Sequence, residues 1–149
     1  MRFGFDTFRA TLSRHGRLIV PAIAIGLLCL SGASSADSLY VICNPSVVLS
    51  QSDVRDVFLG EKQFSGRVRL APADNRAAQA VFLEKILMMS AAKYSTSWIK
   101  KSFRDGVNPL PVKGSDAETI AYVRREKGGC SYVTIQPGPG VKVVSGVAT

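Results

Sequence analysis

The feature that most constrains this chain is an apolar run over residues 18–30, close to the N-terminus. Four arginines precede the run, and the small residues 31–36 follow it. A membrane-spanning helix needs about 18 to 20 apolar residues, whereas a basic segment, a shorter apolar run and a small-x-small end are typical of a cleaved signal peptide. We therefore expect residues 1–36 to be a secretory signal peptide, cleaved after Ala36, that sends the protein to the periplasm without membrane insertion. An uncleaved anchor or a buried helix is the alternative.

Residues 37–149 would then be the mature protein, whose size suits a single globular domain. This segment holds 15 basic and 10 acidic residues, a net charge of +5, and no histidine. Without an imidazole, a Ser/His/Asp or Cys/His nucleophile and a His-ligated zinc site are excluded. The carboxylates are scattered, and no pair of them has the placement of a general acid and base. The sequence therefore predicts that the protein is not an enzyme and holds no cofactor or metal.

The positive charge does not indicate nucleic acid binding. The basic residues are spread along the chain, without a stripe and without aromatic residues between them. Export would also keep the protein away from cytoplasmic nucleic acid. We therefore expect no nucleic acid partner.

Two cysteines, Cys43 and Cys130, remain after residue 36, each in an apolar run that predicts a strand. Disulfides form in exported proteins, whereas a free buried cysteine packs as a small apolar side chain. A disulfide requires a Cα separation of roughly 4.4 to 6.8 Å, which a sequence does not report. The sequence leaves both possibilities open, and we favour two buried thiols over a disulfide.

Strand-like runs and helical periodicity alternate along residues 37–149. Strands are expected at residues 38–43, 67–72 and 130–135, with a further short strand at 141–144. Helices are expected at residues 50–59, 74–89, 90–103 and 116–127. The order predicts the α/β class, with a small, mostly parallel sheet, the first strand at its centre and helices on both faces. Arg67 and Arg69 place the second strand near the sheet edge.

Local signals predict the helix starts and the main core side chains. Ser50 is expected to cap the first helix, and Asp74 or Asn75 the second. Phe58 and Trp98 lie at apolar helical positions and are expected to be core anchors.

The third predicted helix has two different faces. Ser90 can cap it, and Tyr94, Trp98 and Ile99 share its apolar face. Its polar face carries Lys100, Lys101 and Arg104. Such a basic cluster is either a solvated face, which we favour, or a docking patch.

Three segments follow one another in an order that is found in a known family. The first is LSQSDVRDVFLGEKQF at residues 49–64, after a strand that ends in Asn44-Pro45. The second is VRLAPADNRAAQAVF at residues 68–82, and the third is SDAETIAYVRREKGGCSYV at residues 115–133. Together they resemble the phosphate-binding components of ABC transporters, within the periplasmic-binding-protein superfamily.

The resemblance implies a short, single-lobe member of that superfamily. Typical members bind solute in the cleft between two lobes, whereas residues 37–149 have the length of one lobe. Members that hold phosphate use a Ser-Gly-Thr turn at the start of the helix after the second strand. Here the corresponding residues are Asp74, Asn75 and Arg76, so the family's phosphate chemistry is not carried over to them.

An anion site is nevertheless compatible with the predicted sheet. Ligands of parallel sheets gather beyond the carboxyl ends of the strands, where helix N-termini point. Arg76 would supply the positive charge, whereas Asp74, as a helix cap, would repel an anion. The candidate ligand-binding residues are Ser46, Ser50, Asn75, Arg76 and Thr134. In the alternative interpretation these side chains are ordinary turn, cap and surface residues.

The sequence alone therefore leaves two candidate functions. A solute-binding-like protein would capture phosphate or another small oxyanion and present it to an ABC transporter permease. A non-catalytic envelope interaction module would have lost the solute site and would dock on a sensor or transport partner. The Asp74-Asn75-Arg76 turn favours the second function, and the resemblance over residues 39–135 favours the first, which the sequence leads us to prefer.

Overall fold

The computed structural model describes residues 38–148. The predicted signal peptide and its cleavage after Ala36 lie outside the described residues. Within residues 38–148, no helix combines the length and the apolar character that crossing a membrane requires.

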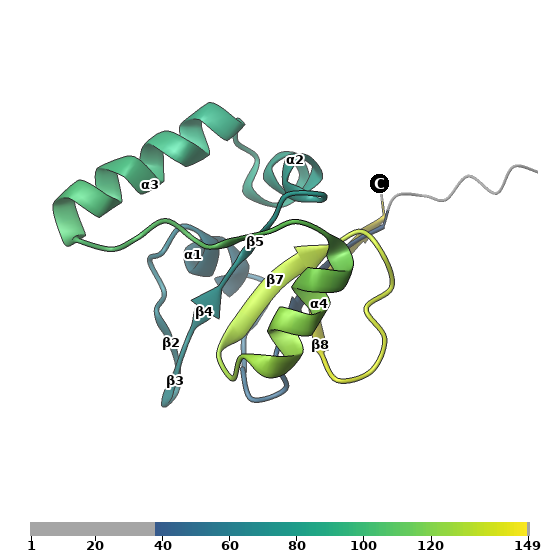
Figure 1. The fold of residues 1–149 in the computed structure, drawn as a ribbon. Helices are drawn as coiled ribbons and strands as arrows, with labels where there is room; N and C mark the ends of the chain where they lie inside the picture. Colours follow the sequence, from purple (N-terminus) through teal and green to yellow (C-terminus); the bar gives the residue numbers. More distant parts are fainter. Residues whose placement is uncertain (1–37, 149) are drawn as a thin grey trace, which may run out of the picture. The chain divides into compact units, whose positions relative to one another are not determined.

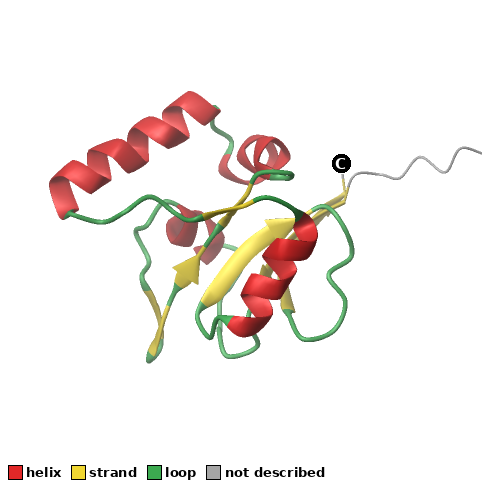
Figure 2. Cartoon of the chain, viewed as in Figure 1, coloured by secondary structure: helices red, strands yellow, loops and turns green. Residues whose placement is uncertain are grey.

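A four-stranded sheet lies at the centre of the described chain (Figures 1 and 2). The strands follow the order β4 (Ala71–Pro72), β7 (Gly129–Val133), β1 (Ser38–Cys43) and β8 (Lys142–Ala148). β1 is antiparallel to both β7 and β8, and β4 runs parallel to β7. The α/β class is confirmed and β1 lies inside the sheet as expected, but the prediction of a mostly parallel sheet is wrong. The sheet is mixed.

The physical reason for this error is that burial does not encode strand direction. A strand that is covered on both faces is apolar on both faces, whichever way its neighbours run. In β1, Leu39, Val41 and Cys43 pack into the larger core, together with residues of α1 (Asp53–Phe58) and α2 (Gln79–Phe82).

The opposite face of the sheet has a smaller core under α4 (Asp116–Arg125). There Ile42 of β1 and Val133 of β7 pack against Ile120 and Val123 of the helix. The prediction of helices on both faces of the sheet is therefore confirmed.

The predicted strand at residues 67–72 is divided into two short strands. β3 (Val68–Arg69) forms a hairpin with β2 (Phe64–Ser65), and β4 then joins the edge of the main sheet. Gly128 permits this crossing, because a Cβ atom at that position would lie only 1.9 Å from the carbonyl oxygen of Arg69. The edge position that the two arginines predict is confirmed for β4.

The second predicted helix starts later than expected. Asp74 and Asn75 instead form β5 (Asp74–Asn75), which runs parallel to β6 (Val112–Lys113). The Asn75 side-chain oxygen accepts a hydrogen bond from the Ala77 amide at 3.1 Å, which makes a turn before α2. Asp74 is therefore not a helix cap. α2 continues into the π-helical turn η1 (Leu83–Leu87), which ends at Met88 with a φ of 52°.

The first predicted helix also starts late. The amide and the hydroxyl of Ser50 both donate to the Asp53 carboxylate, at 2.8 and 2.7 Å. These bonds close a turn, and α1 begins only at Asp53. Ser50 is thus part of the turn before the helix and not its cap.

Both longer helices begin with a serine N-cap, and the cap expected at Ser90 is confirmed. Ser90 accepts a hydrogen bond from the Lys93 amide at 3.2 Å, at the start of α3 (Ala91–Asp105). Ser115 accepts one from the Glu118 amide, also at 3.2 Å, at the start of α4.

The two predicted core anchors are buried, with Phe58 1% and Trp98 5% exposed. Phe58 also packs against the stacked rings of Phe82 and Tyr132, whose centroids are 3.8 Å apart. Ile99 does not share the buried face of α3, because half of its surface is exposed.

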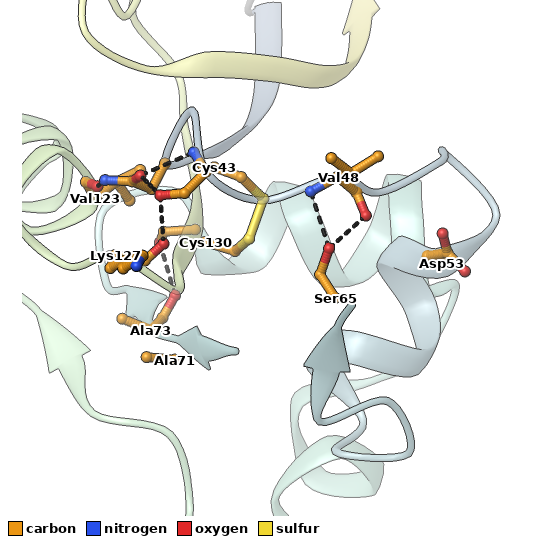
Figure 3. Close-up of a disulfide and its surroundings, with 12 residues drawn as sticks. Cys43, Val48, Asp53, Ser65, Ala71, Ala73, Val123, Lys127 and Cys130 are labelled. Atoms are coloured by element: carbon orange, nitrogen blue, oxygen red, sulfur yellow. Dashed lines mark hydrogen bonds between the residues drawn. A yellow bond between two sulfur atoms is a disulfide. The ribbon is translucent and has the colours of Figure 1, made fainter. Parts of the chain in front are cut away.

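Cys43 and Cys130 form a disulfide (Figure 3). They lie directly opposite each other on β1 and β7, with a Cα separation of 4.1 Å. The Asn44 amide donates to the Gly129 carbonyl beyond them, which marks a non-hydrogen-bonded antiparallel pair, where side chains are closest. Our preference for two buried thiols is therefore wrong, because it did not include antiparallel pairing of these two strands.

Candidate functional site

The mixed sheet separates the five candidate anion ligands into two groups. Because β1 and β7 are antiparallel, the carboxyl end of β1 lies beside the amino end of β7. Ser46 and Ser50 follow β1, whereas Thr134 follows β7 and lies at the opposite end of the strands. The predicted convergence of all five residues is therefore wrong.

Ser46 belongs to a turn that supports the end of α4. Its hydroxyl bonds the Asn44 side-chain oxygen and the Lys127 carbonyl oxygen, the latter at 3.1 Å. The Asn44 amide group donates to the carbonyl oxygens of Val123 at 3.0 Å and Arg124 at 3.2 Å. These bonds use carbonyl groups that the end of a helix leaves without partners. Ser46 therefore has a structural role here.

Asn75 and Thr134 do come together, at the N-terminus of α4. The Asp116 carboxylate joins them: it accepts hydrogen bonds from the Thr134 hydroxyl at 2.7 Å, the Thr134 amide at 3.3 Å and the Asn75 side-chain amide. Asn75 is fully buried and also donates to the Tyr132 carbonyl oxygen at 3.0 Å. We call Asn75, Asp116 and Thr134 the Asp116 cluster.

The Asp116 cluster has the form of an occupied anion site. Asp116 is the first residue of α4, and a negative charge is favourable at a helix N-terminus. The side-chain amide, the hydroxyl and the backbone amide that surround its carboxylate are the donors that would otherwise hold an oxyanion. The Asp116 carboxylate thus occupies the hydrogen-bond donors of Asn75 and Thr134, which the sequence predicts as ligands of an anion.

Arg76 does not take part in the Asp116 cluster. Its backbone amide donates to the Lys113 carbonyl oxygen at 2.9 Å, and the residue is exposed. Its role as a phosphate ligand stays a prediction.

A second polar cluster, which the sequence did not predict, lies inside the larger core. The carboxylate of Asp74 is buried and accepts hydrogen bonds from the Tyr94 hydroxyl at 3.1 Å and the Tyr132 hydroxyl at 2.9 Å. Burial raises the pKa of Asp74, although the two hydroxyls oppose this shift. Burial and the neighbouring carboxylate likewise raise the pKa of both tyrosines.

We call Asp74, Tyr94 and Tyr132 the Asp74 cluster. This cluster stabilises the contact between α3 and the sheet. Its three side chains come from β5, α3 and β7, which are distant in sequence. In the sequence, Tyr94 and Tyr132 have the pattern of ordinary core positions, and only the folded chain brings both hydroxyls to Asp74. A buried carboxylate needs such donors, because an unpaired one would be costly to bury.

Comparison with known proteins supports the fold. No protein-family model matches the sequence, and no curated protein sequence matches it. The structure of PstS from Borrelia burgdorferi is similar, with a TM-score of 0.51 and 14% identity over 73% of this chain and 47% of that one. An ABC-type phosphate transport receptor from Vibrio cholerae gives a TM-score of 0.46 and 14% identity over 72% of this chain and 45% of that one.

The similarity to the Borrelia protein confirms the resemblance that the three sequence segments predict. The fold resembles part of a PstS-type periplasmic binding protein. The chain spans about half the length of the two structures it matches.

Proposed function

We propose that this protein is an exported, non-catalytic interaction module of the cell envelope, built on a single lobe of the periplasmic-binding-protein fold. It docks on a sensor or transport partner, for example an ABC transporter permease, and does not carry free phosphate. The observation that carries this proposal is the Asp116 carboxylate, which occupies the donors of Asn75 and Thr134.

Phosphate would have to compete with a carboxylate that belongs to the chain. Asp116 is attached to the donors through the backbone of α4, so its effective concentration at the site is high. If Asp116 stayed in place, its charge would repel an incoming anion. Arg76 is exposed and is not among the residues that donate a hydrogen bond to Asp116.

The disulfide supports an exported location. A bridge between Cys43 and Cys130 persists in an oxidising compartment such as the periplasm, and cytosolic proteins rarely keep one. This agrees with the predicted signal peptide at residues 1–36. The similar PstS structure is consistent with the same compartment for this fold.

The second candidate function is the capture of phosphate for an ABC transporter. It is favoured by one observation, the similarity to PstS-type structures. In this alternative, Asp116 would turn away, and Arg76 would supply the charge.

Calorimetry distinguishes the two functions. Phosphate, sulfate and acetate at millimolar concentration should give no heat with the wild-type protein and should leave its melting temperature unchanged. Asp116→Ala frees the donors of Asn75 and Thr134, so millimolar phosphate should raise the melting temperature of this variant. Glu118→Ala, which removes a carboxylate from the same helical turn, is the control and should not respond.

Tight binding of phosphate to the wild-type protein, weakened by Arg76→Ala, would instead establish the carrier function. A positive test of the interaction module is crosslinking in intact cells. It should give one adduct of defined mass with an envelope protein.

A further inference from the structure

A cavity of about 360 Å³ lies beside the larger core and shares no lining residue with the Asp116 cluster. Its apolar wall is formed by α1, by the segment that joins β3 to β4, by α3 and by the loop after α3. The side chains of this wall are Val57, Leu70, Pro72, Trp98 and Leu110. A concave site of this volume, lined by apolar side chains and several polar groups, is in the size range of small-ligand pockets.

Two cationic residues are among those that line the cavity. Arg69 and Lys62 line it, together with the amide side chains of Gln63 and Asn108, and no carboxylate is among the lining residues. The Lys62 ammonium is already paired with Asp53 at 2.7 Å. Among the described residues, Arg69 has no ion-pair partner. The cavity therefore offers one uncompensated guanidinium beside an apolar wall.

The loop after α3 adds main-chain groups that are free to bind a ligand. The backbone amides of Val107, Asn108 and Leu110 make no hydrogen bond with any described residue.

From these features we infer that the cavity binds an apolar group that carries one carboxylate. The apolar group would lie against Leu70 and Leu110, and the carboxylate would pair with the Arg69 guanidinium, whose planar fork suits a carboxylate. Two sources have this chemistry: a free branched or aromatic carboxylic acid, and the C-terminal residue of a partner polypeptide.

Inorganic phosphate does not fit this cavity. It has no apolar part, so it would cover none of the apolar wall. The cavity also shares no residue with the Asp116 cluster. The present inference extends the proposed function but does not depend on how the phosphate calorimetry turns out.

Trp98 allows a direct binding experiment, because it is the only tryptophan of the chain and lines the cavity. The fluorescence of the purified protein would be titrated with 4-methylpentanoate and with the peptide acetyl-Ser-Ser-Leu, which has a free C-terminal carboxylate. The neutral 4-methylpentanamide and inorganic phosphate are the control ligands. We expect a saturable change with the two carboxylates, at least about tenfold weaker binding of the amide, and no change with phosphate.

Two matched variants test the role of the free guanidinium. Arg69→Gln should weaken both carboxylates about tenfold or more and leave the amide unchanged, because it removes only the charge-assisted bond. Arg67→Gln removes the same charge from the hairpin turn two residues earlier, which does not line the cavity, and should bind like the wild type. Circular dichroism verifies that both variants fold.

The relative affinity of the two carboxylates identifies the source of the ligand. Tighter binding of the peptide indicates the C-terminus of a partner, and tighter binding of 4-methylpentanoate indicates a free acid. The inference is overturned if no carboxylate changes the fluorescence up to millimolar concentration, if the amide binds equally well, or if Arg69→Gln and Arg67→Gln behave alike.

Discussion

Reduction of the Cys43–Cys130 disulfide should remove a large part of the stability of this protein. The bridge joins residues 87 positions apart and lies between two interior strands. A crosslink of this span restricts the unfolded chain, and the loop-closure estimate for it is about 4.5 kcal/mol at 25 °C. Domains are commonly stable by only about 5 to 15 kcal/mol, so the reduced protein should be marginally stable.

Reduction removes the covalent crosslink and leaves the packing of the two side chains almost unchanged, so it measures the effect of the crosslink alone. Both cysteines are at most 1% exposed, and the thiols keep nearly the same volume after reduction. The double variant Cys43→Ala/Cys130→Ala also loses the packing of the two sulfur atoms, at roughly 1 kcal/mol each. It should therefore be less stable than the reduced wild type.

Equilibrium urea unfolding measures this difference. Trp98 fluorescence and circular dichroism would be followed with and without a phosphine reductant. The free energy of unfolding should fall by about 4 to 5 kcal/mol on reduction. The m-value should rise, because the reduced unfolded chain exposes more surface. The reductant should not affect the double alanine variant.

A loss below about 1 kcal/mol, with full reduction verified by thiol titration, would refute the loop-closure reasoning. It would show that the unfolded chain stays compact without the bridge.

Three further outcomes follow from single contacts. Phe58→Ala should lower the free energy of unfolding by about 3 to 5 kcal/mol, and a loss below about 1 kcal/mol would mean that the ring is not a core anchor. Gly128→Ala should prevent folding or destabilise the protein severely, because its Cβ would lie 1.9 Å from a backbone carbonyl oxygen. Gly66→Ala should cost only about 1 kcal/mol for its positive φ, because nothing lies within 4 Å of the added Cβ. Equal thermal stability of the two variants would contradict this prediction. Asp53 has its pKa lowered to about 2, mainly by its hydrogen bond with Lys62. Its contribution to stability is therefore present above about pH 4 and is lost as the pH falls toward 2, so acid unfolding of Asp53→Asn should show a shallower pH dependence.

Local signals in the sequence determined the order of the elements and much of their packing. Ser90 caps its helix through a hydrogen bond that spans three residues, so neighbouring sequence suffices to predict it. The apolar character of β1 on both faces predicted a strand with a helix layer on each side. The three ordered segments predicted the resemblance to the PstS fold.

Tertiary structure decided the direction of the strands and, with it, the disulfide. Apolar runs report burial, which is the same for parallel and antiparallel neighbours. The antiparallel register of β1 and β7 brings Cys43 opposite Cys130 and moves Ser46 away from Thr134.

Tertiary structure also decided which groups satisfy the buried polar atoms. Asp74 looks like a helix cap in the sequence, but the sheet turns its carboxylate toward two tyrosine hydroxyls. Asp116 lies 41 residues from Asn75 and 18 from Thr134, yet it binds both. A hydrogen bond needs only proximity in space, and the chain acquires that proximity when the strands pair. For this reason the sequence offers donors for an anion, and only the folded protein shows that its own carboxylate takes them.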